Sequence, residues 1–172
     1  WIKRRDGTAG SQLYDSVRGA TKRLQANKNT DESTEATGLK SFDSDGFTLG
    51  TLGGSNGNTE TFVAWNWKAG GSASTISADS ISSGVPANAS SVSVNTDAGF
   101  SIISYTGTGS TTTFGHGLGV QPEAMFIKNR DADRGWFLLT KAFQTKYFSL
   151  EGTGSGQTGY YLSSNTFDDR MT

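Results

Sequence analysis

The sequence has 172 residues, of which 33% are hydrophobic, and a formal net charge of −1. This balance lacks the basic excess of a nucleic-acid-binding surface, and no apolar run approaches the roughly 20 residues that span a bilayer. Cysteine is absent, which excludes disulfides and thiolate metal ligands. We therefore expect neither nucleic-acid binding nor membrane insertion, and we expect so polar a chain to gain stability from neighbouring modules or subunits.

The first segment, Trp1 to Asp6, recurs near the other end of the sequence. Phe126 to Asp131 repeats it at an offset of 127 − 2 = 125 residues. Two further matches follow in the same order: Thr21 to Leu24 with Thr145 to Phe148 at 145 − 21 = 124, and Ser41 to Asp43 with Thr166 to Asp168 at 167 − 42 = 125. Three matches in order predict a segment of a longer protein built from copies of one module, as in fibres, adhesins and virion appendages.

The next segment, Ser11 to Asn27, has apolar residues at helical spacing, which alone would predict an amphipathic helix. Its counterpart in the repeat, from Gly135 to Leu150, is rich in aromatic residues, which favours strands. Because two copies of one module share a fold, we predict strands in both segments.

Further strands are predicted before residue 70. From Lys40 to Thr51, apolar residues flank Asp43-Ser44-Asp45-Gly46, a pattern typical of a hairpin. From Thr59 to Lys68, successive residues alternate in character, and Trp65 and Trp67 share one face. We expect this tryptophan face to lie in the core.

The second half of the sequence predicts an all-β fold of sandwich modules, jelly-roll-like and in tandem, with Gly-, Ser- and Thr-rich loops. Its three predicted strands are Ser91–Val94, Gly99–Tyr105 and Ala124–Lys128. The predicted division assigns 1–70 to the C-terminal part of one repeat module, 71–90 to a Gly/Ser/Ala-rich linker or long loop, and 91–172 to a second β module containing the partial repeat of 1–50 at 126–172.

The single histidine lies in Gly115-His116-Gly117-Leu118-Gly119. A glycine-rich loop can hold a phosphate, but the Lys and the Ser or Thr that end a P-loop are missing, and no Rossmann pattern surrounds the segment. We therefore interpret it as a tight turn whose glycines adopt positive φ.

Asp43, Asp45 and Gly46 begin like a calcium-binding loop, but the twelfth position of that pattern is Gly54 rather than a bidentate Glu. An Asx turn accounts for the same residues. The sequence predicts no metal site, with Asp43 and Asp45 as the candidates nearest to one, and no cofactor. Because no set of residues meets the requirements of a catalytic mechanism, we predict that the chain is not an enzyme. The sequence identifies no ligand-binding residues.

Several segments resemble a repeat domain found in tailed bacteriophages. They are Trp1-Ile2-Lys3 with Arg5-Asp6, Tyr14 to Ala20, Ser41 to Phe47, Val63-Ala64-Trp65 with Trp67-Lys68, Asn95 to Ile102, and Gly115 to Val120 with Pro122. The resemblance weakens after Lys141. It implies a domain of tail-fibre-like and other virion structural proteins, often in tandem and beside lectin-like sandwich domains, and it carries over no catalytic residues.

These observations predict a non-enzymatic structural and adhesive module of a phage tail fibre or similar virion surface appendage, and therefore an extracellular location. The expected partners are further copies of the chain, as a homo-oligomer with a trimer as the candidate stoichiometry, together with other virion proteins and host surface glycans. Three alternatives stay open: a lectin-like carbohydrate-binding module, a repeat unit of a cellular extracellular filament, and a polysaccharide depolymerase.

Overall fold

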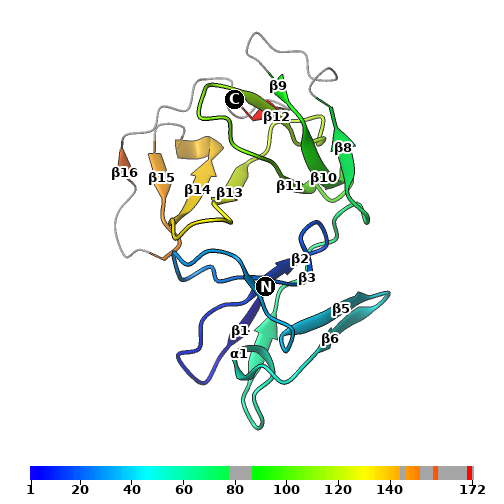
Figure 1. Ribbon diagram of the computed structural model, residues 1–172, viewed down its shortest axis with the longest axis vertical. Helices are drawn as coiled ribbons and strands as arrows, with labels where there is room; N and C mark the ends of the chain where they lie inside the picture. The colour runs from blue at the N-terminus through cyan, green and yellow to red at the C-terminus, as the bar shows by residue number, and fades with distance from the viewer. Residues whose placement is uncertain (78–86, 144–145, 152–156, 159–169, 172) are drawn as a thin grey trace. The chain divides into compact units, whose positions relative to one another are not determined.

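The computed structural model describes residues 1–77, 87–143, 146–151, 157–158 and 170–171, and its regular structure is almost entirely β (Figure 1). The strands are β1 (Ile2–Arg4), β2 (Leu13–Asp15), β3 (Gly19–Leu24), β4 (Ser33–Thr34), β5 (Leu39–Asp43), β6 (Gly46–Leu49), β7 (Phe62–Ala64), β8 (Ser74–Ile76), β9 (Ala87–Asn88), β10 (Ser90–Asn95), β11 (Phe100–Ser104), β12 (Thr113–Gly115), β13 (Ala124–Lys128), β14 (Trp136–Thr140), β15 (Lys146–Phe148), β16 (Gln157–Thr158) and β17 (Arg170–Met171). The described helical elements are α1 (Gly53–Asn56) and the 3-10 helix η2 (Lys141–Phe143).

The all-β prediction is confirmed, including the segment from Ser11 to Asn27, which contains β2 and β3 rather than a helix. The predicted hairpin is β5 paired with β6, and the three strands predicted in the second half correspond to β10, β11 and β13. The predicted linker at 71–90 contains β8 and part of the β9–β10 region, while residues 78–86 lie outside the described residues.

The first of two compact units comprises Trp1–Asn66, Phe126–Leu138 and Phe148–Ser155. In it β1 pairs with β7, β2-β3-β4 form an antiparallel meander, and β5-β6 form a separate hairpin. Its buried hydrophobic side chains, among the described residues, are Ile2, Tyr14, Leu24, Ala26, Leu39 and Trp136. Burial of these side chains supplies the main driving force for folding of the unit.

The pairing of β2 with β3 changes register. Leu13 lies opposite Leu24 and Asp15 opposite Gly19, so a step of 15 − 13 = 2 residues along β2 corresponds to a step of 24 − 19 = 5 residues along β3. Gly19 has φ of 104°, a conformation that favours glycine, and it closes the turn from β2 into β3.

The second unit comprises Trp67–Met125, Leu139–Tyr147 and Gly156–Thr172. It contains two three-stranded sheets, with the strand orders β11-β10-β8 and β17-β12-β9. Its buried hydrophobic side chains, within the part of the chain that the structure describes, are Val92, Phe114, Leu118 and Leu139. The ring of Tyr105 lies 4.2 Å from that of Phe114, which extends this core toward the surface.

A further sheet has the order β13-β14-β15-β16 (Figure 1). Its pairing of β15 with β16 repeats the pairing of β3 with β4. Lys22 lies opposite Thr34, and Lys146 lies opposite Thr158. Both residues of the second pair are displaced by the same number, since 146 − 22 = 124 and 158 − 34 = 124. The two copies seen in the sequence therefore also pair equivalent residues in these strands.

The beginnings of the two copies share a side-chain hydrogen bond. Lys3 donates from Nζ to the Ala9 carbonyl oxygen at 2.8 Å, and Lys128 donates to the Arg134 carbonyl oxygen at 2.6 Å. Both residues are displaced by 125, since 128 − 3 = 125 and 134 − 9 = 125. The two lysines thus hold equivalent turns, although β1 also pairs with β7 whereas β13 has β14 as its neighbour in the described sheet.

Candidate functional site

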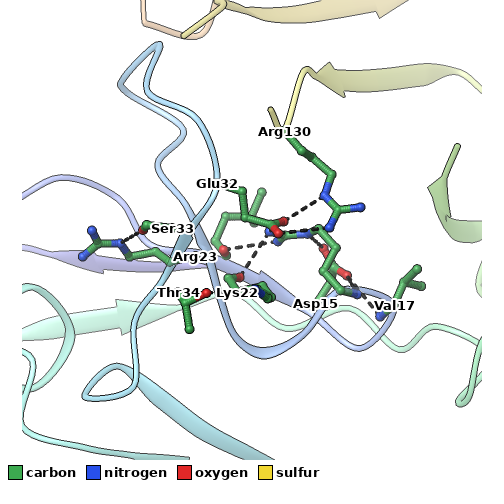
Figure 2. Close-up of polar contacts among 10 residues, drawn as sticks. Asp15, Val17, Lys22, Arg23, Glu32, Ser33, Thr34 and Arg130 are labelled. Atoms are coloured by element: carbon green, nitrogen blue, oxygen red, sulfur yellow. Dashed lines mark hydrogen bonds and ion pairs between the residues drawn. The ribbon is translucent and has the colours of Figure 1, made fainter. Parts of the chain in front are cut away.

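The densest polar cluster of the first unit joins the two copies of the repeat. We call residues 25–32, between β3 and β4, the acidic loop, and residues 128–136, between β13 and β14, the gripping hairpin. Glu32 of the acidic loop forms ion pairs with both Arg18 and Arg130. Figure 2 shows the side chains of Glu32 and Arg130 pointing toward one another. Residues 98 positions apart are thereby brought into direct contact.

Arg130 binds Glu32 through a two-pronged ion pair. Its Nε lies 2.9 Å from Oε2, and its Nη2 lies 3.0 Å from Oε1. The Glu32 main-chain nitrogen also donates to the Arg130 carbonyl oxygen at 2.9 Å. This bidentate geometry fixes orientation as well as distance, which a single lysine would not do.

Arg18 supports the same carboxylate from the other side. It donates from Nη1 to Glu32 Oε2 at 3.0 Å and from Nε to Asp15 Oδ2 at 2.5 Å. Asp15 in turn accepts hydrogen bonds from the main-chain nitrogens of Val17 and Arg18 through Oδ1, so it forms an Asx turn that fixes the start of the Arg18 side chain. The Arg18 side chain is only 5% exposed, so it needs both carboxylates to compensate its buried charge.

The neighbouring arginines determine the charge state of Glu32. Burial would raise the pKa of its carboxyl group, but the hydrogen bonds from Arg130 and Arg18 outweigh burial and hold the pKa below its ordinary value. The same contact raises the pKa of Arg130. Both shifts favour the charged forms of Glu32 and Arg130, so their ion pair is stable at neutral pH and joins two segments of the chain.

Three further hydrogen bonds connect the gripping hairpin to the acidic loop. Lys128 donates to the Asn29 carbonyl oxygen at 3.0 Å, and the Asp31 main-chain nitrogen donates to Asp133 at 3.0 Å. The buried Trp136 donates from Nε1 to the Gln25 carbonyl oxygen at 3.0 Å. The loop is thus held at its first residue, near its middle and at the two acidic residues at its end.

Asp43 and Asp45, the candidate calcium ligands, lie in the β5–β6 hairpin. Asp43 accepts a hydrogen bond from the Ser41 hydroxyl at 2.7 Å and from the Thr48 hydroxyl at 2.8 Å, and these bonds lower the pKa of its carboxyl group. Asp45 is exposed in the turn. Across the described residues, no group of three or more His, Asp or Glu side chains could hold a metal ion.

The glycine-rich segment around His116 forms a buried turn. Gly117 and Gly119 have φ of 75° and 71°, as the turn interpretation predicts. His116 is 2% exposed, and its Nδ1 accepts a hydrogen bond from the Leu118 main-chain nitrogen at 3.2 Å. The buried imidazole thus stabilises its own turn.

The expectation that Trp65 and Trp67 form a core face is wrong. Their exposed fractions are 48% and 53%. The alternation stops being a strand pattern because β7 ends at Ala64, so the two indoles extend beyond the sheet. Trp65 packs edge-on against Trp1, with ring centres 6.3 Å apart, and Trp67 stacks on Phe100 at 6.2 Å.

Sequence reasoning did not select Arg18 or Glu32. Glu32 lies in a polar stretch with no periodicity, and its partners are set by tertiary structure. Arg130 belongs to the recognised repeat, where its counterpart is Arg5, because 130 − 125 = 5. The arginine repeated at this position of both copies was the feature of the sequence that could have pointed to Arg130 as a site residue.

Comparison with known proteins gives a family but no relative of described activity. Among the described residues, no helix has the length and apolar character required to cross a membrane. No curated protein and no solved structure matches the chain. One family profile matches residues 1–171, and the chain therefore belongs to the family described as "Domain of unknown function (DUF7483)".

Proposed function

We propose that the chain is a non-enzymatic structural and adhesive module of a phage tail fibre or similar virion surface appendage. The observation that carries this proposal is the joint between the two copies of the repeat. Glu32 of one copy forms an ion pair with Arg130 of the next, and the contact includes a main-chain hydrogen bond as well as side-chain hydrogen bonds. A contact of this kind between successive modules suits a protein that gains reach by repetition.

The proposal includes the finer architecture and the partners expected from the sequence. The sheets would form tandem jelly-roll-like sandwiches, and the module would function as an oligomer outside the cell. Its partners would be copies of itself, other virion proteins and host surface glycans. The sequence resemblance to tail-fibre-like proteins supports this assignment to virions.

Immunogold electron microscopy tests the proposal directly. Antibodies raised against the purified chain should label the tail appendages of the phage whose genome encodes it. Antibodies preabsorbed with the chain should leave the particles unlabelled. Labelling of a cellular filament instead, with bare virions, would favour the alternative of a cellular repeat unit.

A second candidate, carbohydrate binding, is favoured by the exposed indoles of Trp65 and Trp67. An aromatic face open to solvent can stack on a sugar ring, whereas a buried one cannot. Glycans should quench tryptophan fluorescence in the wild-type chain, and Trp65→Ala or Trp67→Ala should weaken that binding at least tenfold. Trp136→Phe is the matched control, because Trp136 is 4% exposed. Release of reducing ends from the glycans would identify a depolymerase.

A further inference from the structure

In the first copy of the repeat, β7 covers one edge of β1. Trp1 donates from its main-chain nitrogen to the Trp65 carbonyl oxygen at 3.0 Å, and its own carbonyl oxygen accepts from the Trp65 nitrogen at 2.9 Å. At the other end of the strand, the Arg5 main-chain nitrogen donates to the Thr61 carbonyl oxygen at 2.8 Å. Every second residue, from Trp1 through Lys3 to Arg5, therefore directs its main-chain groups toward β7. The rings of Trp1 and Trp65 also pack edge-on, with centres 6.3 Å apart.

The second copy lacks this covering strand. β13 is the end strand of its described sheet, and β14 is its neighbour there (Figure 1). The second copy extends only to the counterpart of residue 47, because 172 − 125 = 47, whereas β7 begins at Phe62. The 172 residues thus contain β7 itself but no counterpart of it in the second copy.

The edge left on β13 matches the edge that β7 covers on β1. Trp1 corresponds to Phe126 and Lys3 to Lys128, since 126 − 1 = 125 and 128 − 3 = 125. An aromatic ring is therefore present where β7 would bring its tryptophan, and Phe126 is 55% exposed. Among the described residues, no loop or turn bonds to the main chain of Phe126 or Lys128.

The acidic loop sets the length of this open edge. The Glu32 main-chain nitrogen donates to the Arg130 carbonyl oxygen at 2.9 Å, so the edge is closed at that end. The open stretch ends before Arg130 and includes Phe126 and Lys128. A strand that docks there in the register of β7 places its counterpart of Trp65 against the Phe126 ring.

We propose that the open edge of β13 is the docking site for the β7-type strand that completes the second copy. A β7-type strand is an extended segment with the pattern of Phe62-Val63-Ala64-Trp65. This docking rests on the proposed function as a repeating module. In the first copy the strand that covers β1 belongs to the same copy, so in an array the occupant of β13 is the strand encoded farther along the second copy. An added strand satisfies the unpaired main-chain groups of an edge, and its side chains provide specificity.

The segment that contains β7 supplies the probe for the test. A fluorescein-labelled peptide of residues 59–68 should bind the chain saturably in fluorescence anisotropy, and a scrambled peptide of the same composition should not. Hydrogen exchange should slow at the amides of Phe126 and Lys128 when the peptide is bound, because these amides face the open edge. The same peptide carrying Trp65→Ala should bind at least fivefold more weakly, since it lacks the indole that packs on Phe126.

Variants of the chain locate the bound peptide. Phe126→Pro removes the ring together with an amide that faces the open edge, a position where a strand tolerates proline. F126P should bind the peptide at least tenfold more weakly. Val120→Ala is the matched control and should bind like the wild-type chain, because Val120 is 65% exposed and lies outside β13. Should F126P fail to fold, Phe126→Ser keeps the amide, removes the ring and should weaken binding at least fivefold.

Three results would overturn the proposal: equal binding of the scrambled peptide, unchanged affinity in F126P, or slowed exchange in β1 instead of β13. Dimerisation of the chain through β13, without binding of the peptide, would identify a second β13 as the occupant and would also overturn it. Immunogold labelling of virions does not depend on the peptide. Failed peptide binding with labelling intact would refute the docking alone, whereas absent labelling with intact binding would refute the proposed role in virions.

Discussion

The turn that follows β1 and the turn that follows β13 are closed by the same lysine hydrogen bond, but their arginine side chains differ in what they bind. In both, a lysine closes the turn with one hydrogen bond to a carbonyl oxygen. Arg130 of the second copy binds Glu32, whereas the corresponding Arg5 is exposed. The comparison teaches that local sequence specifies the turn, while the partner of its arginine depends on which loop reaches it.

The largest effect is expected on removing the shared carboxylate. Glu32→Ala eliminates the bonds to Arg18 and Arg130, and it leaves the buried Arg18 charge with Asp15 as its remaining carboxylate partner among the described residues. We expect a loss of about 3 kcal/mol in the free energy of unfolding, measured by urea denaturation. Glu123→Gln is the control, because the Glu123 side chain is 81% exposed and should change stability by less than about 0.5 kcal/mol. Equal losses of unfolding free energy in Glu32→Ala and Glu123→Gln would contradict a stabilising role for the buried ion pairs of Glu32.

Acid should weaken the same joint. The pKa of Glu32 is lower in the folded chain than its ordinary value of 4.5, so its contribution is fully present above that value and is lost as the pH falls through the folded-state pKa. Unfolding free energies measured from pH 7 downward should therefore fall less steeply in Glu32→Gln than in the wild-type chain. If the unfolding free energies of the two proteins fell in parallel with pH, Glu32 would not contribute to the pH dependence of stability.

Trp136 tests the part of the joint that has no counterpart in the first copy, where Ser11 occupies the position 136 − 125 = 11. Trp136→Phe keeps a buried ring but loses the hydrogen bond to the Gln25 carbonyl oxygen and part of the packing. We expect a cost of about 1–2 kcal/mol in thermal or urea unfolding. Trp67→Phe, at an exposed position, should cost much less.

The smallest expected difference separates the two arginines themselves. Arg130→Ala should destabilise the chain by about 1 kcal/mol, reduced by the 39% exposure of its side chain. Arg5→Ala should change the unfolding free energy by less than about 0.5 kcal/mol, because its side chain has no bond to lose among the described residues. Equal costs for the two substitutions would remove the asymmetry between the copies.

Much of the fold could be predicted because the repeat adds information to each local pattern. The strands β2 and β3 have helical spacing of apolar residues, and only their aromatic-rich counterpart indicated strands. The burial of Trp65 was predicted wrongly because alternation does not show where a strand ends, and β7 ends at Ala64. The joint could not be predicted, since Glu32 meets Arg130 through tertiary structure and its own neighbours carry no pattern.

The register shift between β2 and β3 has a consequence for how such modules change in length. The offset between copies is 125 at Lys3 and Lys128 but 124 at Lys22 and Lys146, so one residue is gained or lost between these positions. An unabsorbed change of one residue would turn every later side chain to the opposite face of its sheet. The register shift between the pairs Leu13–Leu24 and Asp15–Gly19 lies within this interval and can take up that residue. A one-residue insertion or deletion at this position would therefore leave the side chains of the later strands on their own faces.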